Sequence, residues 1–286
     1  MFQNQALMNR RRTELTVIAV LIVGVIGYAG AGLALSATRV ANAEHTLNVV
    51  VSHQNTLTTT FNAINTQLSQ LTSGSVFNPQ QSIILVDKSV SNSELATKTI
   101  EEDDSSLASV ASQLGSMRWL TLVGQNSLDR EAGRVQHGRN ALGAARTIAS
   151  DELQDGHFWH SLYAAIYDLT RLEAQVYAND LTAAQTTLGT FKADVDSALS
   201  LSSAPGLPVE LHDMMADMQT FVGDYGKQLS AQIAGDDASV AAYQPTVDAD
   251  RTKLGTYDYD KIGAAITAYY KPLIDRFNTE IAAATG

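Results

Sequence analysis

The chain has 286 residues, a net charge of −11 and a hydrophobic fraction of 45%, ordinary for a globular protein of one or two domains. It contains no cysteine, so disulfide scaffolds, thiol catalysis, iron–sulfur clusters and cysteine-bound zinc are excluded. The negative charge disfavours nucleic acid and anionic lipid surfaces as partners.

An apolar run near the N-terminus predicts a membrane anchor. Residues 15–37 contain no charged side chain and would span roughly 34 Å as a helix, enough for a bilayer core of about 30 Å. Arginines at 10–12 precede the run and only Arg39 follows it, which predicts a cytoplasmic tail at 1–14 and an exported remainder. A cleaved signal peptide is the alternative, with Ala41-Asn42-Ala43 as its site, although a usual h-region has only about 7–15 residues.

The exported part is acidic. From Arg39 onward there are 16 basic and 29 acidic residues, a net charge of −13. No Asn-x-Ser/Thr sequon occurs, which favours a bacterial or archaeal envelope over a glycosylated eukaryotic ectodomain. We therefore expect a single-pass protein of the cell membrane, with its N-terminus in the cytoplasm and its C-terminal part extracytoplasmic.

Helical periodicity continues beyond the anchor. The spacing of residues 40–71 alternates between three and four, as in a heptad, and predicts one helix from the anchor to a stop near Thr72-Ser73-Gly74. The e and g positions carry no charge pairs, which favours packing in a bundle of the same chain over a free dimeric coiled coil. The residues of this stripe are Val40, Ala43, Leu47, Val50, Gln54, Leu57, Phe61, Ile64, Leu68 and Leu71.

The same region lacks charge. The 42 residues from His45 to Val86 include no Asp, Glu, Lys or Arg, although exposed helices normally carry charged faces. One interpretation is a surface rich in Thr, Ser, Asn and Gln. The other is a face covered by another helix or by a partner protein, because charge is depleted at interface cores. The second interpretation makes Gln54, Thr58 and Asn65 partner-binding candidates.

Capping signals place the next helices. Asn78-Pro79 predicts a helix start, with the helix reaching Ile100, and the acidic run at 101–104 predicts a turn or a new first turn. Five glycines interrupt the helical stretch at 105–154, and each costs about 1 kcal/mol relative to alanine, so breaks are expected. Asp155-Gly156 is predicted to end this stretch.

The C-terminal half shows clearer boundaries. Helices at 157–177 and 181–201, joined by a tight turn, form an expected antiparallel pair. The Pro/Gly-rich segment Ala204–Pro208 is the strongest break. Beyond it we expect a helix at 209–234, one that contains Pro245 and follows a cap at 235–237, and a last helix at 257–284 kinked at Pro272.

The predicted fold is therefore all-α: one N-terminal transmembrane helix that continues into an extracytoplasmic antiparallel helical bundle. The expected parts are a cytoplasmic tail at 1–14, an anchor at 15–37, a membrane-proximal helical bundle at 38–204 and a C-terminal helical subdomain at 205–286.

Motifs with a known catalytic mechanism are missing. The sequence has no His-Glu-x-x-His, no Gly-x-x-x-x-Gly-Lys and no Gly-x-Ser-x-Gly. Together with the low fraction of charged residues, 17%, and the helical pattern, this predicts a protein that is not an enzyme and that carries no cofactor.

An aromatic group is the first candidate binding site. His157, His160, Tyr163 and Tyr167 follow helical spacing and could line a pocket for a small ligand, with histidine providing pH sensitivity. The favoured interpretation is an aromatic core stripe with polar tips at its rim.

Two further groups of residues are candidate sites. His212, Met215 and Met218 offer imidazole and thioether ligands for copper(I), but methionine is also an ordinary core residue. The segment Tyr257–Asp260, with two tyrosines at 269 and 270, offers interface anchors, although capping aspartates at a helix start explain it equally well.

We therefore expect a non-enzymatic, membrane-anchored, extracytoplasmic helical protein that acts as an interaction or scaffolding subunit of a cell-envelope assembly. Its partners would be the membrane, through residues 15–37, and an envelope protein, but no nucleic acid. The alternatives are a small-ligand-binding or sensor-like module and a copper-binding protein. In architecture alone, the layout resembles the sensory ectodomains of bacterial receptors.

Overall fold

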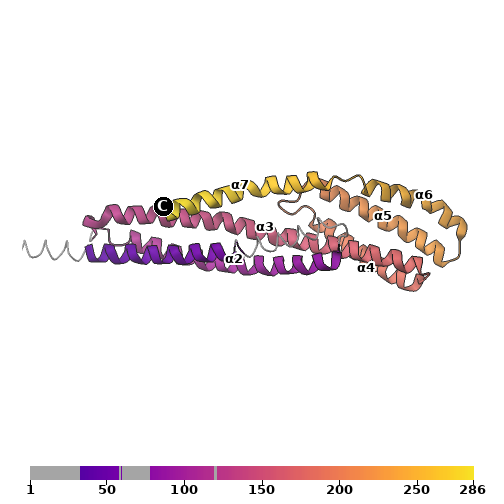
Figure 1. The fold of residues 1–286 in the computed structure, drawn as a ribbon, viewed down its shortest axis with the longest axis horizontal. Coiled ribbons are helices and arrows are strands. Elements are labelled where there is room, and N and C mark those ends of the chain that lie inside the picture. The colour runs from indigo at the N-terminus through magenta and orange to yellow at the C-terminus, as the bar shows by residue number, and fades with distance from the viewer. Residues whose placement is uncertain (1–32, 58, 60–77, 119–120) are drawn as a thin grey trace, which may run out of the picture. The chain divides into compact units, whose positions relative to one another are not determined.

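A computed structural model describes residues 33–57, 59, 78–118 and 121–286 (Figure 1). These residues are almost entirely helical and include no strand, which confirms the all-α prediction for this part of the chain. None of the helices in these ranges is long and apolar enough to cross a membrane. The predicted anchor lies outside the described residues except for 33–37, which are helical.

The first described helix covers residues 33–57 and follows the predicted stripe. Ala43, Leu47 and Val50 are fully buried, and Gln54 is buried as well. The face predicted by the heptad spacing therefore packs within the chain itself, and the e and g positions beside it carry no charge. The predicted stop near residues 72–74 lies outside the described residues.

Helix α2 (Pro79–Gly115) starts as predicted but is longer than predicted. The Asn78 side chain caps it by accepting a hydrogen bond from the Gln81 N–H at 3.2 Å. The predicted end at Ile100 and turn at 101–104 are wrong, because the helix continues through the acidic run.

A heptad stripe that runs through the acidic segment explains this continuity. Asp103 is itself a member of the stripe and only 4% exposed, and its Oδ1 lies 2.9 Å from His53 Nδ1. The neighbouring Asp104 accepts a hydrogen bond from Arg139 at 2.8 Å. The buried stripe of α2 consists of Ser82, Val86, Ser93, Ala96, Ile100, Asp103, Leu107, Val110 and Leu114.

Helix α3 (Gln125–Tyr177) has 53 residues and follows a 3-10 turn, η1 (Leu122–Gly124). The break predicted among the glycines occurs between α2 and α3. The end predicted at Asp155-Gly156 is wrong, because α3 continues through it. Other segments pack closely against the backbone of α3 at Gly138 and Gly156, which explains glycine at these positions.

These two close contacts come from distant segments. A Cβ on Gly138 would lie 3.0 Å from Leu47 Cδ2 and 3.1 Å from Leu107 Cδ1. A Cβ on Gly156 would lie 2.5 Å from Val90 Cγ2, a distance that real Cβ contacts do not show. The helix therefore keeps glycine where a neighbour approaches its backbone.

We expect Gly156→Ala to lower the free energy of unfolding by about 1–3 kcal/mol, because the stiff Val90 side chain must move. The matched control is Gly143→Ala in the same helix, where nothing lies within 4 Å. That change should stabilise by about 0.5–1 kcal/mol through helix propensity alone. Urea unfolding followed by circular dichroism measures both, and effects of the same sign would contradict the packing argument.

The turn after α3 has the predicted form. Asn179 adopts a φ of +58°, and Asp180 caps α4 (Leu181–Leu201) by accepting a hydrogen bond from the Ala183 N–H at 3.2 Å. Strong local signals of this kind predict boundaries well, because they do not depend on distant contacts.

The remaining helices are α5 (Val209–Ile233), α6 (Asp237–Leu254) and α7 (Tyr259–Thr285). Of these, α5 and α7 match their predicted ranges to within about two residues, and α6 begins at its predicted cap. Pro245 lies inside α6 and Pro272 inside α7.

The chain divides into two compact units. Unit 1 comprises Met1–His53, Glu101–Leu142 and Asn278–Gly286, and unit 2 comprises Gln54–Ile100 and Gly143–Phe277. The Pro/Gly-rich loop between α4 and α5, predicted as a boundary, lies within unit 2.

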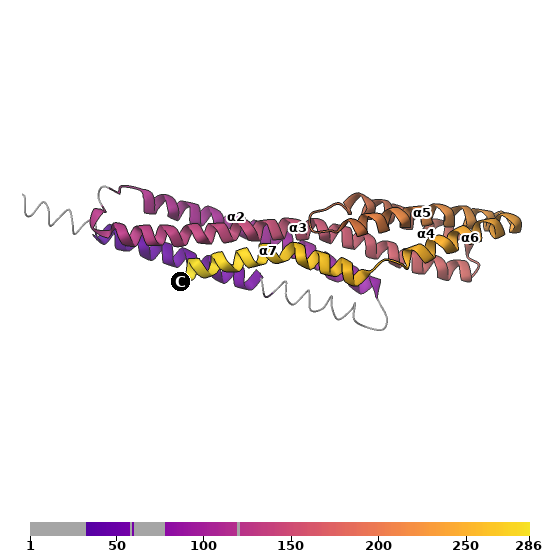
Figure 2. The same ribbon diagram turned by 90° about the horizontal axis from the view of Figure 1, so that it is seen from above.

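Unit 2 contains the main apolar core. Phe158 of α3, Phe191 of α4 and Phe221 of α5 are its largest fully buried side chains. Figure 2 shows α4 and α5 alongside each other, and most core residues come from these helices and α3. Helices α6 and α7 contribute only Val247 and Ile262 to the fully buried part of this core.

A buried charge network holds part of unit 1 together. The fully buried Glu131 carboxylate accepts a hydrogen bond from Arg134 at 2.8 Å. The same guanidinium donates to the carbonyl oxygen of Ala284 at 2.8 Å, near the end of α7. A cation at a helix C-terminus is favourable there, so this network has a structural explanation.

Candidate functional site

The strongest candidate site is a group of carboxyl and phenol side chains in unit 2, here named the acid–tyrosine cluster. Helix α3 contributes Asp151, Glu152 and Asp155, and α7 contributes Tyr269 and Tyr270. The Tyr269 hydroxyl donates to Asp151 Oδ2 at 2.9 Å, and the Tyr270 hydroxyl donates to Asp155 Oδ2 at 2.6 Å. Two consecutive residues of α7 thus bind two carboxylates that lie one turn apart on α3.

Asp155 lies in an environment that disfavours its charge. It is 5% exposed, and its Oδ1 is buried without a hydrogen-bond partner. Burial raises its pKa to about 7, the Tyr270 hydrogen bond opposes the rise, and the Glu152 and Asp151 carboxylates add to it. Burial likewise raises the pKa of Glu152.

The pKa values of the two tyrosines are raised as well. Burial raises the pKa of Tyr270, and its hydrogen bond to Asp155 raises it further. The same two causes, burial and the bond to Asp151, raise the pKa of Tyr269. Both phenols are therefore held as hydrogen-bond donors at neutral pH. Their rings contact each other edge to face, with centroids 5.2 Å apart.

The loop between α4 and α5 closes over this cluster. Gly206 has a φ of +93°, a backbone conformation that glycine adopts without strain. A Cβ at this position would lie 3.1 Å from both Asp155 Oδ2 and the Tyr270 hydroxyl oxygen. The break in the sequence at 204–208 therefore positions backbone directly against the buried carboxyl.

The cluster can hold and release a proton near neutral pH, since Asp155 has a pKa of about 7. Among the residues that the structure describes, no three His, Cys, Asp or Glu side chains are grouped so as to hold a metal ion. The chemistry available to the cluster is protonation and hydrogen bonding between α3 and α7.

The residues of the predicted aromatic group have different environments on α3. His157 is exposed, whereas His160 Nδ1 lies 2.6 Å from Asp87 Oδ1 of α2. Tyr163 packs against Trp159 with ring centroids 5.8 Å apart, and burial raises its pKa. Tyr167 is half-buried. His160 and Tyr163 thus contact other side chains of unit 2.

The predicted copper ligands lie in different environments. His212 is exposed, and its Nδ1 lies 2.8 Å from the Ser202 hydroxyl. Met215 and Met218 belong to the apolar core of unit 2. The thioethers therefore pack with core side chains.

The tyrosine segment at the start of α7 has a local explanation. Asp258 caps the helix by accepting a hydrogen bond from the Lys261 N–H at 3.0 Å. Tyr257 donates to Asp217 at 2.7 Å, and burial together with this bond raises its pKa to about 12. Tyr259 remains exposed.

Of the predicted partner-binding residues, only one is described. Gln54 is 4% exposed and belongs to the buried stripe of its helix, so its side chain faces the chain itself. Thr58 and Asn65 lie outside the residues whose side chains are described.

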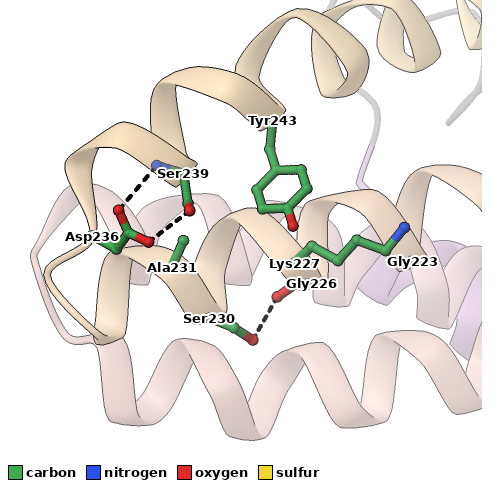
Figure 3. Close-up of a pocket in the computed structure, with 8 residues that line it drawn as sticks. All are labelled: Gly223, Gly226, Lys227, Ser230, Ala231, Asp236, Ser239 and Tyr243. Carbon is green, nitrogen blue, oxygen red and sulfur yellow. Dashed lines mark hydrogen bonds between the residues drawn. The ribbon is translucent and has the colours of Figure 1, made fainter.

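A shallow groove between α5 and α6 is a second feature of unit 2 (Figure 3). Gly223 and Gly226 of α5 line it, and the Tyr243 side chain points toward α5 from α6. Lys227 at its edge donates to Asp224 at 2.6 Å, and the Asp236 carboxylate caps α6 through Ser239. Lys227, Ser230, Asp236 and Ser239 of the groove thus have structural partners.

Sequence reasoning missed the acid–tyrosine cluster. The available signal was the spacing of Asp151, Glu152 and Asp155, which share one side of a helix if the helix continues. Interpreting Asp155-Gly156 as a helix end separated Asp155 from this pattern. The sequence indicates Tyr270 and Tyr269 as interface anchors, but their partners lie 115 and 118 residues earlier in the chain.

Comparison of the chain with models of protein families, with curated proteins and with solved structures finds no match.

Proposed function

We propose that this protein is a non-enzymatic, membrane-anchored helical protein of the cell envelope that acts as an interaction or scaffolding subunit. In this proposal residues 15–37 tether it to the membrane, and the uncharged segment His45–Val86 contacts a protein partner. The proposal rests on the absence of charge over these 42 residues.

The described part of this segment supports the proposal. In the helix at 33–57, the buried stripe is occupied by Leu47, Val50 and Gln54. The solvent-facing positions between them carry uncharged side chains, among them Asn48 and Val49, and Val49 is 39% exposed. A solvent-facing surface without charge loses little on desolvation, which suits a protein contact.

We expect the double substitution Thr58→Lys and Asn65→Lys to abolish partner binding, because each ammonium group would have to lose its hydration at the interface. The measurement is mild extraction of the full chain from its own membrane, followed by native mass spectrometry. The wild type should carry a stoichiometric protein partner, and the variant should be at least about tenfold depleted of it.

The matched control introduces the same charge elsewhere. Thr182→Lys and Thr186→Lys change two exposed threonines of α4 and should leave the complex intact. The same partner occupancy in both double variants, or a chain that never carries a protein partner, would refute the proposal.

A further inference from the structure

Helix α7 is attached to unit 2 with little apolar burial. Between Tyr259 and Phe277, only Ile262 and Tyr270 are buried. The hydrogen bonds that tie this stretch to α3 come from Tyr269 and Tyr270. Elements with few buried apolar contacts open at a lower free energy than a packed core. The attachment of this part of α7 to α3 therefore depends on the hydrogen bonds of the acid–tyrosine cluster.

The protonation state of Asp155 determines how favourable the contact between α3 and α7 is. As a neutral acid, the carboxyl keeps the Tyr270 hydrogen bond and places no charge in a site shielded from water. As an anion, it is buried with one oxygen unpartnered, beside two further acidic side chains. Separation of α7 from α3 would return the anion to water, so ionisation favours the open form.

We propose that the acid–tyrosine cluster is a proton-operated latch between α3 and α7: it is closed while the buried Asp155 carboxyl carries a proton, and it opens when that carboxyl ionises. The ligand of the cluster is thus the proton. The parts of the chain that respond to it are α7 and the α4–α5 loop, which covers the cluster. This inference is independent of the proposed partner surface, since it uses only contacts within unit 2.

The groups around Asp155 make the latch respond in this direction. Its own helix supplies the acids Asp151 and Glu152, and α7 supplies two phenols. The α4–α5 loop approaches with the backbone of Gly206, which carries no titratable group. Helix α2 reaches the next residue of α3 through the apolar side chain of Val90. Each acidic neighbour therefore favours protonation of Asp155.

The test is hydrogen–deuterium exchange of the full chain in detergent micelles, measured from pH 5 to pH 8.5 and corrected for the intrinsic pH dependence of exchange. We expect the amides of 262–277 to lose protection as pH rises. With a closed-state pKa of about 7 and an ordinary open-state value of 3.8, the loss between pH 5.5 and 8 is up to ~30-fold. Peptides from α4 and α5 should keep their protection, because their core contains none of the cluster.

Two variants distinguish the latch from other causes. Asp155→Asn should keep α7 protected at both pH values, because the amide cannot ionise. Tyr270→Phe should shift the midpoint of the transition to higher pH. In the wild type the Tyr270 hydrogen bond lowers the pKa of Asp155, so its loss raises that pKa. The second variant keeps the proposal testable if the first folds poorly.

Asp194→Asn is the matched control. Asp194 lies on α4 in unit 2, and burial raises its pKa as well, but it is not part of the contact between α3 and α7. This variant should retain the wild-type pH dependence of α7. Exchange of α7 that does not change with pH in the wild type, or that changes equally in Asp155→Asn, would overturn the proposal.

Discussion

Replacing Asp155 by asparagine should stabilise the protein above pH 7 and change little near pH 4. In the folded state the carboxyl has a pKa of about 7, against an ordinary value of 3.8. The folded state therefore binds more protons than the unfolded state between about pH 4 and 7, and the free energy of unfolding falls as pH rises through that window. Asparagine removes this loss.

The expected gain has an upper limit. A difference of about three pKa units corresponds to about 4 kcal/mol at pH 8, and relaxation of the neighbouring acids reduces this figure. Urea unfolding of the full chain in detergent, at several values between pH 4 and pH 8, measures it. The Asp155→Asn curve should be flatter than the wild-type curve and lie above it at high pH. Two parallel curves would show that another group carries the pH dependence.

The second large effect concerns the core of unit 2. We expect Phe191→Ala to lower the free energy of unfolding by about 3–5 kcal/mol, because it leaves a cavity in packed surroundings. Phe191 is fully buried and meets Phe221 edge to face, with ring centroids 6.4 Å apart. Denaturant unfolding gives the size of the effect, and hydrogen exchange of α3, α4 and α5 peptides shows whether it is located in unit 2.

The control for this change is the next residue along the chain. Lys192 is exposed, and its ammonium group pairs with Asp196 one turn later. Lys192→Ala should change the stability by no more than about 0.5 kcal/mol, as exposed pairs of this kind contribute little. If Phe191→Ala were equally mild, α4 would not be packed as described.

In this protein, close packing raises the free energy of unfolding, whereas ionisation of the buried Asp155 carboxyl lowers it. The phenylalanines and the glycines at helix contacts stabilise unit 2 as they are, so changing them is costly. Asp155 lowers stability at neutral pH, so changing it to asparagine is favourable. A residue that lowers stability at the contact between two helices is expected where a function requires the contact to open.

Local chemistry in the sequence determined where several helices begin and end. The caps Asn78 and Asp180 act on backbone N–H groups three residues away, so their effect can be predicted without knowing the fold. The heptad spacing also predicted which face of the helix at 33–57 is buried, because a helix of fixed pitch presents one side to its neighbours.

Only the tertiary structure decided whether the helices continue through unfavourable local signals. The acidic run of α2 stays helical because His53 and Arg139 supply partners from other helices, and α3 passes through Gly156 because Val90 packs there. The acid–tyrosine cluster arises in the same way, since the tyrosines that bind Asp151 and Asp155 come from more than a hundred residues away. Hydrogen bonds and packing depend on atoms within a few ångströms in space, and that proximity is created by folding.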